Sequence, residues 1–280
     1  MSPAGDADLL VAARSALLDA LEALSAHRDA LVLIGAQAIY LRTGGAVVAL
    51  AEATKDSDLA LDPRELSDHP LLDDAMAAAG FHRDLVHPQP GSWLSPTGIP
   101  VDLMVPDALA GSAGRRGARI PPHSRHATRR TAGLEAALID HAPMTVSALD
   151  PSDSRTVEIA VAGSAALLVS KLHKLGERRN DSGRLVDKDA HDIYRLLVAT
   201  EPTELGGRLL PLADDELAGP ATRQAISFLR DLFADATSIG SVMAGRAEQL
   251  VGDPATVSAS SALLASDLLA ELDSGGRTDR

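Results

Sequence analysis

The segment LAEATKDSDLALD (residues 50–62) places two carboxylates two positions apart inside a run of apolar residues. Asp56 and Asp58 lie on either side of Ser57, and Leu59 follows directly. Because alternate side chains of a β-strand point to the same face, a strand over 56–61 would hold both carboxylates on one face. Two anions held that close repel each other. The segment therefore predicts a strand whose paired carboxylates need a positive partner.

The segments around this strand alternate between strand and helix patterns. Gly35 ends a short apolar run, Pro63 is a helix-opening residue, and Gly80 closes the periodic segment that follows. The predicted elements are, in chain order, an amphipathic helix over 6–26, a buried strand over 30–35, a helix over 36–42, the strand over 56–61, a helix over 63–79, and strands over 81–87 and 99–105. This order is typical of an α/β fold with short strands.

The second half of the chain changes from strands to helices near residues 160–163. Alternating segments at 144–149 and 155–163 predict a β-hairpin. Helical spacing of apolar residues then follows over 164–179, 188–199, 220–235, 237–250 and 255–273. We expect an α/β (α+β) fold with a mixed-sheet domain over 1–162, an all-helical domain over 163–273 and a disordered tail over 274–280.

The composition is that of a globular protein. Of the 280 residues, 45% are hydrophobic and 23% charged, and aromatic residues make up only 2%. With no cysteine, the chain has neither a disulfide framework nor a thiolate zinc site. The first residues show no secretory signal, and no apolar run reaches the length of a membrane span. We expect a cytoplasmic protein without a membrane partner.

The net charge of −13 disfavours a nucleic-acid partner, but the positive charges are clustered. A stretch between Asp107 and Glu135 contains no acidic residue, and a second basic group lies within 171–188. Either stretch could bind a polyanion, although a solvated loop explains the first equally well. The candidate RNA-binding residues of the first stretch are Arg115, Arg116, Arg119, Arg125, Arg129 and Arg130.

A third carboxylate, Asp102, lies inside the apolar segment IPVDLMV (99–105). An unpaired charge buried in a strand is unfavourable, so Asp102 needs a partner. If its strand lies beside that of Asp56 and Asp58, three carboxylates converge, and Mg²⁺ or Mn²⁺ would relieve their repulsion. Gly35, between a strand and a helix, could leave backbone N–H groups for a phosphate. Strand ends and a tight turn are the simpler alternatives for these residues.

The order of strand, Gly35, helix, D-x-D strand and later strand Asp resembles the nucleotidyltransferase superfamily. More narrowly, LVLIGAQAIYLRTGG (31–45) with ATKDSDLALD (53–62) resembles AbiEii-type nucleotidyltransferases, which include the MenT toxins of bacterial toxin–antitoxin pairs. The segment LLVSKLHKLGERRNDSGRLVDKDAHDIYRLL (167–197) is similar to a second motif of that group. The chain departs from the pattern at Gly35-Ala36, where the family usually has Gly-Gly or Gly-Ser.

The resemblance implies a nucleotidyltransferase-like fold and a set of roles. Asp56, Asp58 and Asp102 would hold metal, and Asp102 would also orient or deprotonate the attacking hydroxyl. Lys171, on a helix at the cleft, would act on the phosphates without contributing to folding. Asp192, with Asp189 as the alternative, would hold Lys171 or Arg178 in place. The implied nucleotide-binding residues are Gly35, Ala36, Gln37, Arg42, Lys55, Lys171 and Arg178.

The implied activity is transfer of nucleotides from an NTP to an RNA acceptor, with the tRNA 3′ end expected, by a toxin that a partner antitoxin restrains. Two alternatives remain open. The acceptor could be the hydroxyl of a small molecule, as in aminoglycoside nucleotidyltransferases. The chain could also be a non-catalytic nucleotide-binding relative, which the three retained carboxylates disfavour.

Overall fold

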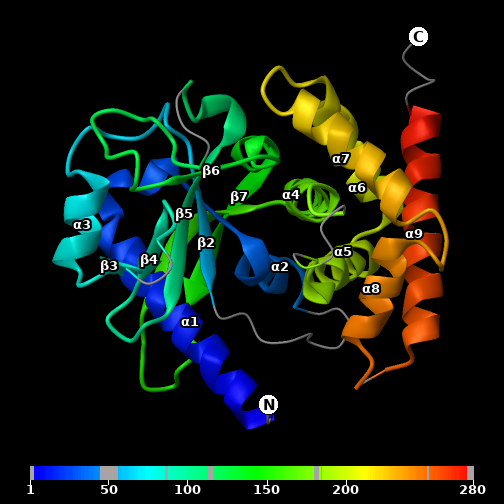
Figure 1. The fold of residues 1–280 in the computed structure, drawn as a ribbon, viewed down its shortest axis with the longest axis horizontal. Helices are drawn as coiled ribbons and strands as arrows, with labels where there is room; N and C mark the ends of the chain where they lie inside the picture. Colours follow the sequence, from blue (N-terminus) through cyan, green and yellow to red (C-terminus); the bar gives the residue numbers. More distant parts are fainter. Residues whose placement is uncertain are drawn as a thin grey trace. The chain divides into compact units, whose positions relative to one another are not determined.

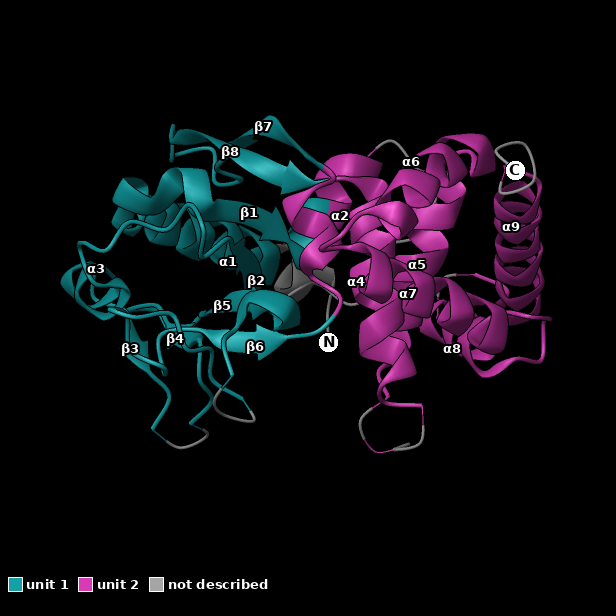
Figure 2. Ribbon diagram, turned by 90° about the horizontal axis from the view of Figure 1, so that it is seen from above, with its two compact units in different colours: residues 1–38, 53–132, 141–162 teal, residues 39–52, 133–140, 163–280 magenta. Residues whose placement is uncertain are grey.

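A computed structural model of the protein describes residues 3–44, 56–85, 88–112, 116–179, 183, 185–250 and 252–275 (Figure 1). The chain divides into two compact units, coloured separately in Figure 2. Unit 1 comprises residues 1–38, 53–132 and 141–162, and unit 2 comprises residues 39–52, 133–140 and 163–280. The fold is mixed α/β with C-terminal helices, which confirms the predicted fold class. Of the predicted tail, 274–275 are helical and 276–280 lie outside the described residues.

Unit 1 is built around a mixed sheet, which has eight strands in the described part of the chain. The strand order is β3-β4-β5-β2-β1-β8-β7, and β6 also pairs with β5. Neighbours are parallel in the pairs β1–β8, β2–β5 and β5–β6, and antiparallel in the others. The strands are β1 (Leu31–Ile34), β2 (Ser57–Leu61), β3 (His82–Arg83), β4 (Ser92–Leu94), β5 (Pro100–Pro106), β6 (Arg129–Thr131), β7 (His141–Ser147) and β8 (Thr156–Ala162).

One face of this sheet is covered by the helix α1 (Pro3–Ala23), which contacts β2, β5 and β8 (Figure 1). A 3₁₀-helix, η1 (Ser25–Ala30), connects α1 to β1. Leu17, Leu21 and Leu24 are almost fully buried, as their helical spacing predicts. All four residues of β1 are buried too, so the apolar run at 30–35 forms a central strand.

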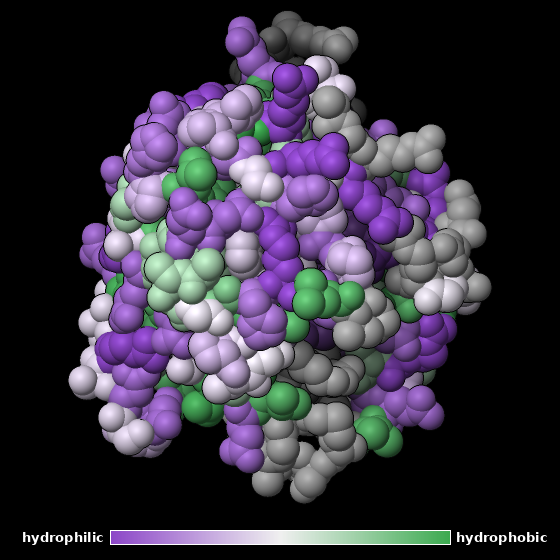
Figure 3. Space-filling view, turned by 60° about the vertical axis from the view of Figure 1, so that its left-hand side comes forward, coloured by the Kyte–Doolittle hydropathy of each residue, from purple (hydrophilic) through white to green (hydrophobic). Residues whose placement is uncertain are grey.

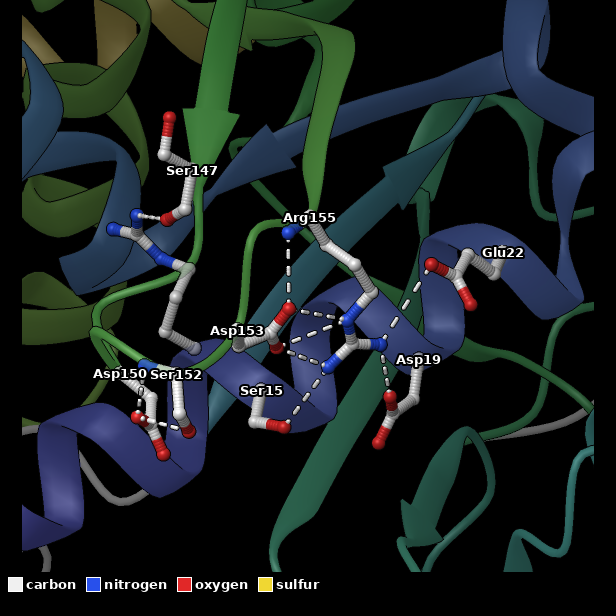
Figure 4. A network of polar contacts seen from close by, with 9 residues as sticks. Ser15, Asp19, Glu22, Ser147, Asp150, Ser152, Asp153 and Arg155 are labelled. Carbon is white, nitrogen blue, oxygen red and sulfur yellow. Dashed lines mark hydrogen bonds and ion pairs between the residues drawn. The ribbon is translucent and has the colours of Figure 1, made fainter.

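A polar network holds α1 to the turn between β7 and β8 (Figure 4). The Arg155 guanidinium donates to Asp19 Oδ1 (2.5 Å) and Ser15 Oγ (3.2 Å), both on α1. It also donates to both oxygens of Asp153 in its own turn. Hydrogen bonding to Asp153 and Asp19 raises the pKa of Arg155, so this residue stays fully charged.

The predicted helix over 63–79 is wrong in its first half, because α3 spans only Leu72–Ala78. Pro70 lacks an N–H group and disfavours a helical conformation of the residue before it, so the helix begins after this position. The Leu72 N–H donates to Nδ1 of His123 (3.3 Å), whose Nε2 lies 3.0 Å from the Ser67 carbonyl oxygen. Burial lowers the pKa of His123, which keeps Nδ1 available as an acceptor.

In the rest of unit 1, the structure narrows one predicted strand, adds a strand that was not predicted and confirms the predicted hairpin. The strand expected over 81–87 is limited to β3, and residues 86–87 lie outside the described residues. The turn-rich segment before β5 contains the unexpected strand β4, in which Trp93 is buried and donates to the Ala127 carbonyl oxygen (3.0 Å). The expected hairpin is confirmed as the antiparallel pair β7–β8.

Unit 2 consists mainly of helices, and α2 (Gly35–Thr43) begins in unit 1 and ends in unit 2. The other α-helices are α4 (Ser164–Gly176), α5 (Asp187–Ala199), α6 (Pro202–Asp214), α7 (Gly219–Leu232), α8 (Ile239–Ala247) and α9 (Pro254–Gly275). The sequence did not predict α6, because Gly206, Gly207 and Pro211 lower its helical propensity. A side chain at Gly206 would overlap Glu271 of α9, so glycine permits close packing of these two helices.

Two short 3₁₀-helices complete the described elements, η2 (Asp107–Leu109) after β5 and η3 (Glu135–Leu138) before β7. The face of the molecule in Figure 3 is mostly hydrophilic, with apolar side chains in small groups among charged ones. Within the described ranges, none of the helices combines the length and the apolar character that a membrane crossing needs.

Candidate active site

The carboxylates of Asp58 and Asp102 lie on neighbouring strands at matching positions. β2 and β5 are parallel, and Asp58 pairs with Asp102 in their register. Residues paired in this way project to the same face of a sheet, so the two side chains are neighbours. Both side chains are partly exposed. The sequence-based expectation that these two acids come together is therefore met.

This pair lies on the sheet face opposite to α1. Ser57, one residue before Asp58, is buried and its Oγ donates to the Ala13 carbonyl oxygen of α1 (3.1 Å). Because consecutive strand residues point to opposite faces, Asp58 points away from α1. Asp102 points the same way, since it is in register with Asp58.

Asp56 is exposed and precedes the first residue of β2. Lys55, a predicted nucleotide-binding residue, lies outside the described residues. Over the described residues, no group of three or more His, Asp or Glu side chains is placed to hold a metal ion. Of the three predicted metal ligands, the structure brings together Asp58 and Asp102. Carboxylate oxygens are ligands that Mg²⁺ uses together with substrate phosphates.

Gly35 forms the corner between β1 and α2 and has a positive φ of 69°. A Cβ atom at this position would overlap the Asp58 carboxylate. Glycine is therefore required both for the backbone conformation and for the close approach of Asp58. The carboxylate lies at the N-terminal end of α2, where the helix dipole stabilises an anion. The predicted phosphate seat is thus next to Asp58.

Two other predicted nucleotide-binding residues near this corner are buried. Gln37 is 1% exposed, accepts from Arg14 Nε (2.7 Å) and donates to Ser57 Oγ (3.0 Å). These contacts give Gln37 a role in joining α1, α2 and β2. Ala36 is buried as well. Arg42, near the end of α2, is half-buried, and burial is the main cause that lowers its pKa.

Asp102 forms an ion pair with Arg129, which the sequence assigned to RNA binding. Arg129 is the first residue of β6, and its Nη2 lies 2.7 Å from Asp102 Oδ2. The same guanidinium contacts Gln89 Oε1 (3.4 Å) and Met104 Sδ (3.5 Å). The partner that a carboxylate in this strand needs is therefore a side chain from a neighbouring strand, which the linear sequence does not identify.

The remaining arginines of the basic stretch differ from one another in environment. Arg130 Nε lies 2.6 Å from Asp107 Oδ1, and Arg130 also donates to the Gly111 carbonyl oxygen (2.9 Å). Arg115 lies outside the described residues. The exposed members, which are best placed to meet a polyanion, are Arg116, Arg119 and Arg125.

A second charged cluster lies entirely in unit 2. Lys171 of α4 is only 7% exposed, and its Nζ lies 3.1 Å from Asp189 Oδ1 and 2.7 Å from Asp192 Oδ2 of α5. Lys174 (2.9 Å) and Arg178 (3.7 Å) also approach Asp189. Both candidate acids therefore contact Lys171. The expectation that this lysine makes no contribution to folding is not compatible with its burial.

Charge pairing keeps Asp189 ionised in this cluster. Burial alone would raise the pKa of its carboxyl, but Lys171 and Lys174 outweigh that effect and lower it. Asp189 is thus an anion held between cations, and it fixes α5 against α4. The Asp189 carboxylate therefore holds the side chains of Lys171, Lys174 and Arg178 in position.

Comparisons with protein-family models, with curated proteins and with solved structures found no match for this chain. Its function is therefore inferred from the placement of its own residues.

Proposed function

We propose that this protein is a metal-dependent nucleotidyltransferase that transfers nucleotides from an NTP to the 3′ end of an RNA, with tRNA as the acceptor. The observation that carries the proposal is the pairing of Asp58 with Asp102 on adjacent parallel strands, beside the glycine corner at Gly35. The resemblance of the surrounding segments to AbiEii-type nucleotidyltransferases supports the same assignment. It further suggests a toxin that a partner protein restrains.

The donor set fits a hard divalent cation. Asp58 and Asp102 offer carboxylate oxygens on one face, and Mg²⁺ is commonly held by one or two carboxylates plus phosphate oxygens. Asp56, two residues before Asp58, is the further candidate ligand. When bound, the cation would neutralise phosphate charge while the 3′-hydroxyl oxygen bonds to the α-phosphorus of the NTP and pyrophosphate leaves.

The residues of the chain would contribute position and proton transfer. Asp102 would accept the proton of the attacking 3′-hydroxyl or orient that group. The backbone N–H groups at the start of α2 would face the phosphates. In unit 2, Lys171 would hold Asp189 and Asp192. Lys174 and Arg178 also pair with Asp189 but are more exposed than Lys171, so they are the members of this cluster that an anion could reach.

A tRNA acceptor is preferred to a small-molecule acceptor because of the exposed arginines at 116, 119 and 125. A polyanion gains affinity from such charges by releasing counterions, whereas a small neutral hydroxyl compound does not need them. Both acceptors are tested together in the following assay.

The purified chain is incubated with Mg²⁺, radiolabelled NTPs, total tRNA and a hydroxylated antibiotic, and the labelled RNA and the labelled antibiotic are separated on a gel and by thin-layer chromatography. We expect label at the tRNA 3′ end, and we expect Asp58→Asn to lose at least about a hundredfold in rate. Asp107→Asn is the matched control, because Asp107 follows β5 but is exposed and pairs with Arg130. It should remain active.

Two results would contradict the proposal. Equal activity of Asp58→Asn and wild type would exclude the carboxylate pair as the metal site. Labelling of a hydroxylated antibiotic in place of RNA would assign the small-molecule activity.

Binding gives a second readout, since Mg²⁺ with NTP should raise the melting temperature of wild type but not of Asp58→Asn. Expression without a partner should arrest growth for wild type only.

A further inference from the structure

The ion pair between Arg129 and Asp102 lies within the proposed metal site. The exposed fractions of the two side chains are 27% and 14%, so both charges are partly withdrawn from water. Asp102 is one of the two carboxylates paired across β2 and β5. A cation that binds both carboxylates must therefore share Asp102 with a guanidinium that already contacts it.

Strand pairing explains why Arg129 reaches this carboxylate. In the parallel pair β5–β6, Arg129 is the partner of Met104, two residues after Asp102. Met104 and Asp102 share a face, and Arg129 contacts both side chains on it. The guanidinium therefore lies on the same face as Asp58 and Asp102.

We propose that Arg129 competes with the divalent cation for Asp102 and so sets the cation concentration at which the site fills. This inference rests on the proposed function, because it needs the cation to bind Asp58 and Asp102. The physical reason is twofold. The guanidinium occupies an oxygen of Asp102, and its positive charge repels a cation placed beside it.

A nucleotide would change this competition. Its phosphates are partners for a displaced guanidinium, because arginine binds phosphate oxygens with paired N–H groups. Nucleotide and cation would then favour each other's binding, and the coupling would be reciprocal. The cation site would thus fill efficiently only when an NTP is present.

The adjacent residue provides a matched control. Arg130 also lies in β6 and also pairs with an aspartate, Asp107 (2.6 Å). Because neighbouring strand residues point to opposite faces, Arg130 lies on the other side of the sheet from Asp102. Replacing Arg130 removes the same charge from the same strand without freeing the carboxylate pair.

The test measures Mn²⁺ binding to the full chain by electron paramagnetic resonance of the free ion, without nucleotide. We expect Arg129→Gln to bind Mn²⁺ about three- to fivefold more tightly than wild type, the upper part of the range that loss of a partly exposed ion pair gives. Arg130→Gln should bind within about twofold of wild type. Arg129→Lys, which keeps the charge, should also stay close to wild type. Arg129→Met removes the charge as well, and it replaces Arg129→Gln if that variant fails to fold.

Repeating the titration with a non-hydrolysable NTP analogue measures the coupling. The analogue should tighten Mn²⁺ binding more in wild type than in Arg129→Gln. Unchanged or weaker Mn²⁺ binding by Arg129→Gln, with normal binding by wild type, would overturn this inference and leave the proposed function intact. Absence of Mn²⁺ binding in every variant, with the analogue present, would overturn both.

Discussion

The candidate site depends on contacts that single residues make. Gly35 combines a positive φ with contact to the Asp58 carboxylate, so any side chain there would both strain the backbone and displace the acid. Arg129 and Asp102 carry opposite charges and form an ion pair across two strands. For each of these residues, the role depends on the side chain that it contacts as well as on its own chemistry.

Lys171 gives the sharpest prediction at the scale of a residue. Lys171→Met would leave the Asp189 and Asp192 carboxylates buried without their main cation, since both contact Lys171. We expect the free energy of unfolding to fall by about 3–5 kcal/mol, the usual cost of removing one partner of a buried ion pair. Urea denaturation measures this loss.

Lys174→Met is the control for this experiment. Lys174 is on the same helix and also pairs with Asp189, but its side chain is 44% exposed. Its replacement should cost only about 0–1 kcal/mol. If the two variants lost equal stability, the structural role of Lys171 would be wrong.

At the scale of elements, helix ends and strand connections are held by side chains from distant segments. His123 accepts the Leu72 N–H at the start of α3, although the two residues are far apart in sequence. Arg155 joins α1 to the turn between β7 and β8 (Figure 4). Such contacts decide where an element begins and how it is oriented.

Arg155→Gln tests the attachment of α1 to the β7–β8 turn. The substitution removes the ion pairs with Asp19 and Asp153, which are partly exposed. We expect the free energy of unfolding to fall by about 1 kcal/mol, and the difference from wild type to shrink in 1 M salt.

Arg28→Gln is the comparison for Arg155→Gln, because Arg28 contacts β8 through a long hydrogen bond to the Glu158 carbonyl oxygen (3.4 Å) and not through an acidic side chain. It should change stability by less than about 0.5 kcal/mol. A salt-independent loss in Arg155→Gln would show that packing, and not the ion pairs, attaches α1.

At the scale of the whole molecule, an acidic protein is proposed to bind an acidic substrate. The net charge is −13, so binding must rely on local positive charge. Arg129 and Arg130 are held in ion pairs, which leaves the exposed Arg116, Arg119 and Arg125 as the proposed RNA contacts in the described basic stretch.

Neutralising these three arginines to glutamine should weaken tRNA binding and reduce the slope of log K against log salt by about 2–3, because about three fewer phosphates are contacted. Fluorescence anisotropy with a labelled tRNA at increasing KCl measures this slope. The control neutralises Arg208, Arg230 and Arg246, which carry the same charge but pair with acids in unit 2. An equal effect in both triple variants would exclude a local RNA-binding surface.

The sequence by itself determined the elements whose apolar pattern is strong. Periodicity identified β1, β2, β5, the β7–β8 hairpin and five of the helices after Ser164 that the structure describes. It failed for α6, whose glycines and proline weaken the local signal, and for the first half of the helix expected over 63–79. Short strands such as β4 and β6 have too few residues for a pattern.

The sequence also identified Asp58, Asp102 and Gly35 as candidates, because charges in apolar strands and a glycine at a strand end stand out locally. Only the tertiary structure decided their partners. The register of β2 against β5 makes Asp58 and Asp102 neighbours, and the pairing of β6 with β5 gives Asp102 its arginine. Folding likewise buried Lys171 between two acids. Local sequence encodes the backbone preference of a segment, whereas ion pairs between distant residues arise from strand order and helix packing.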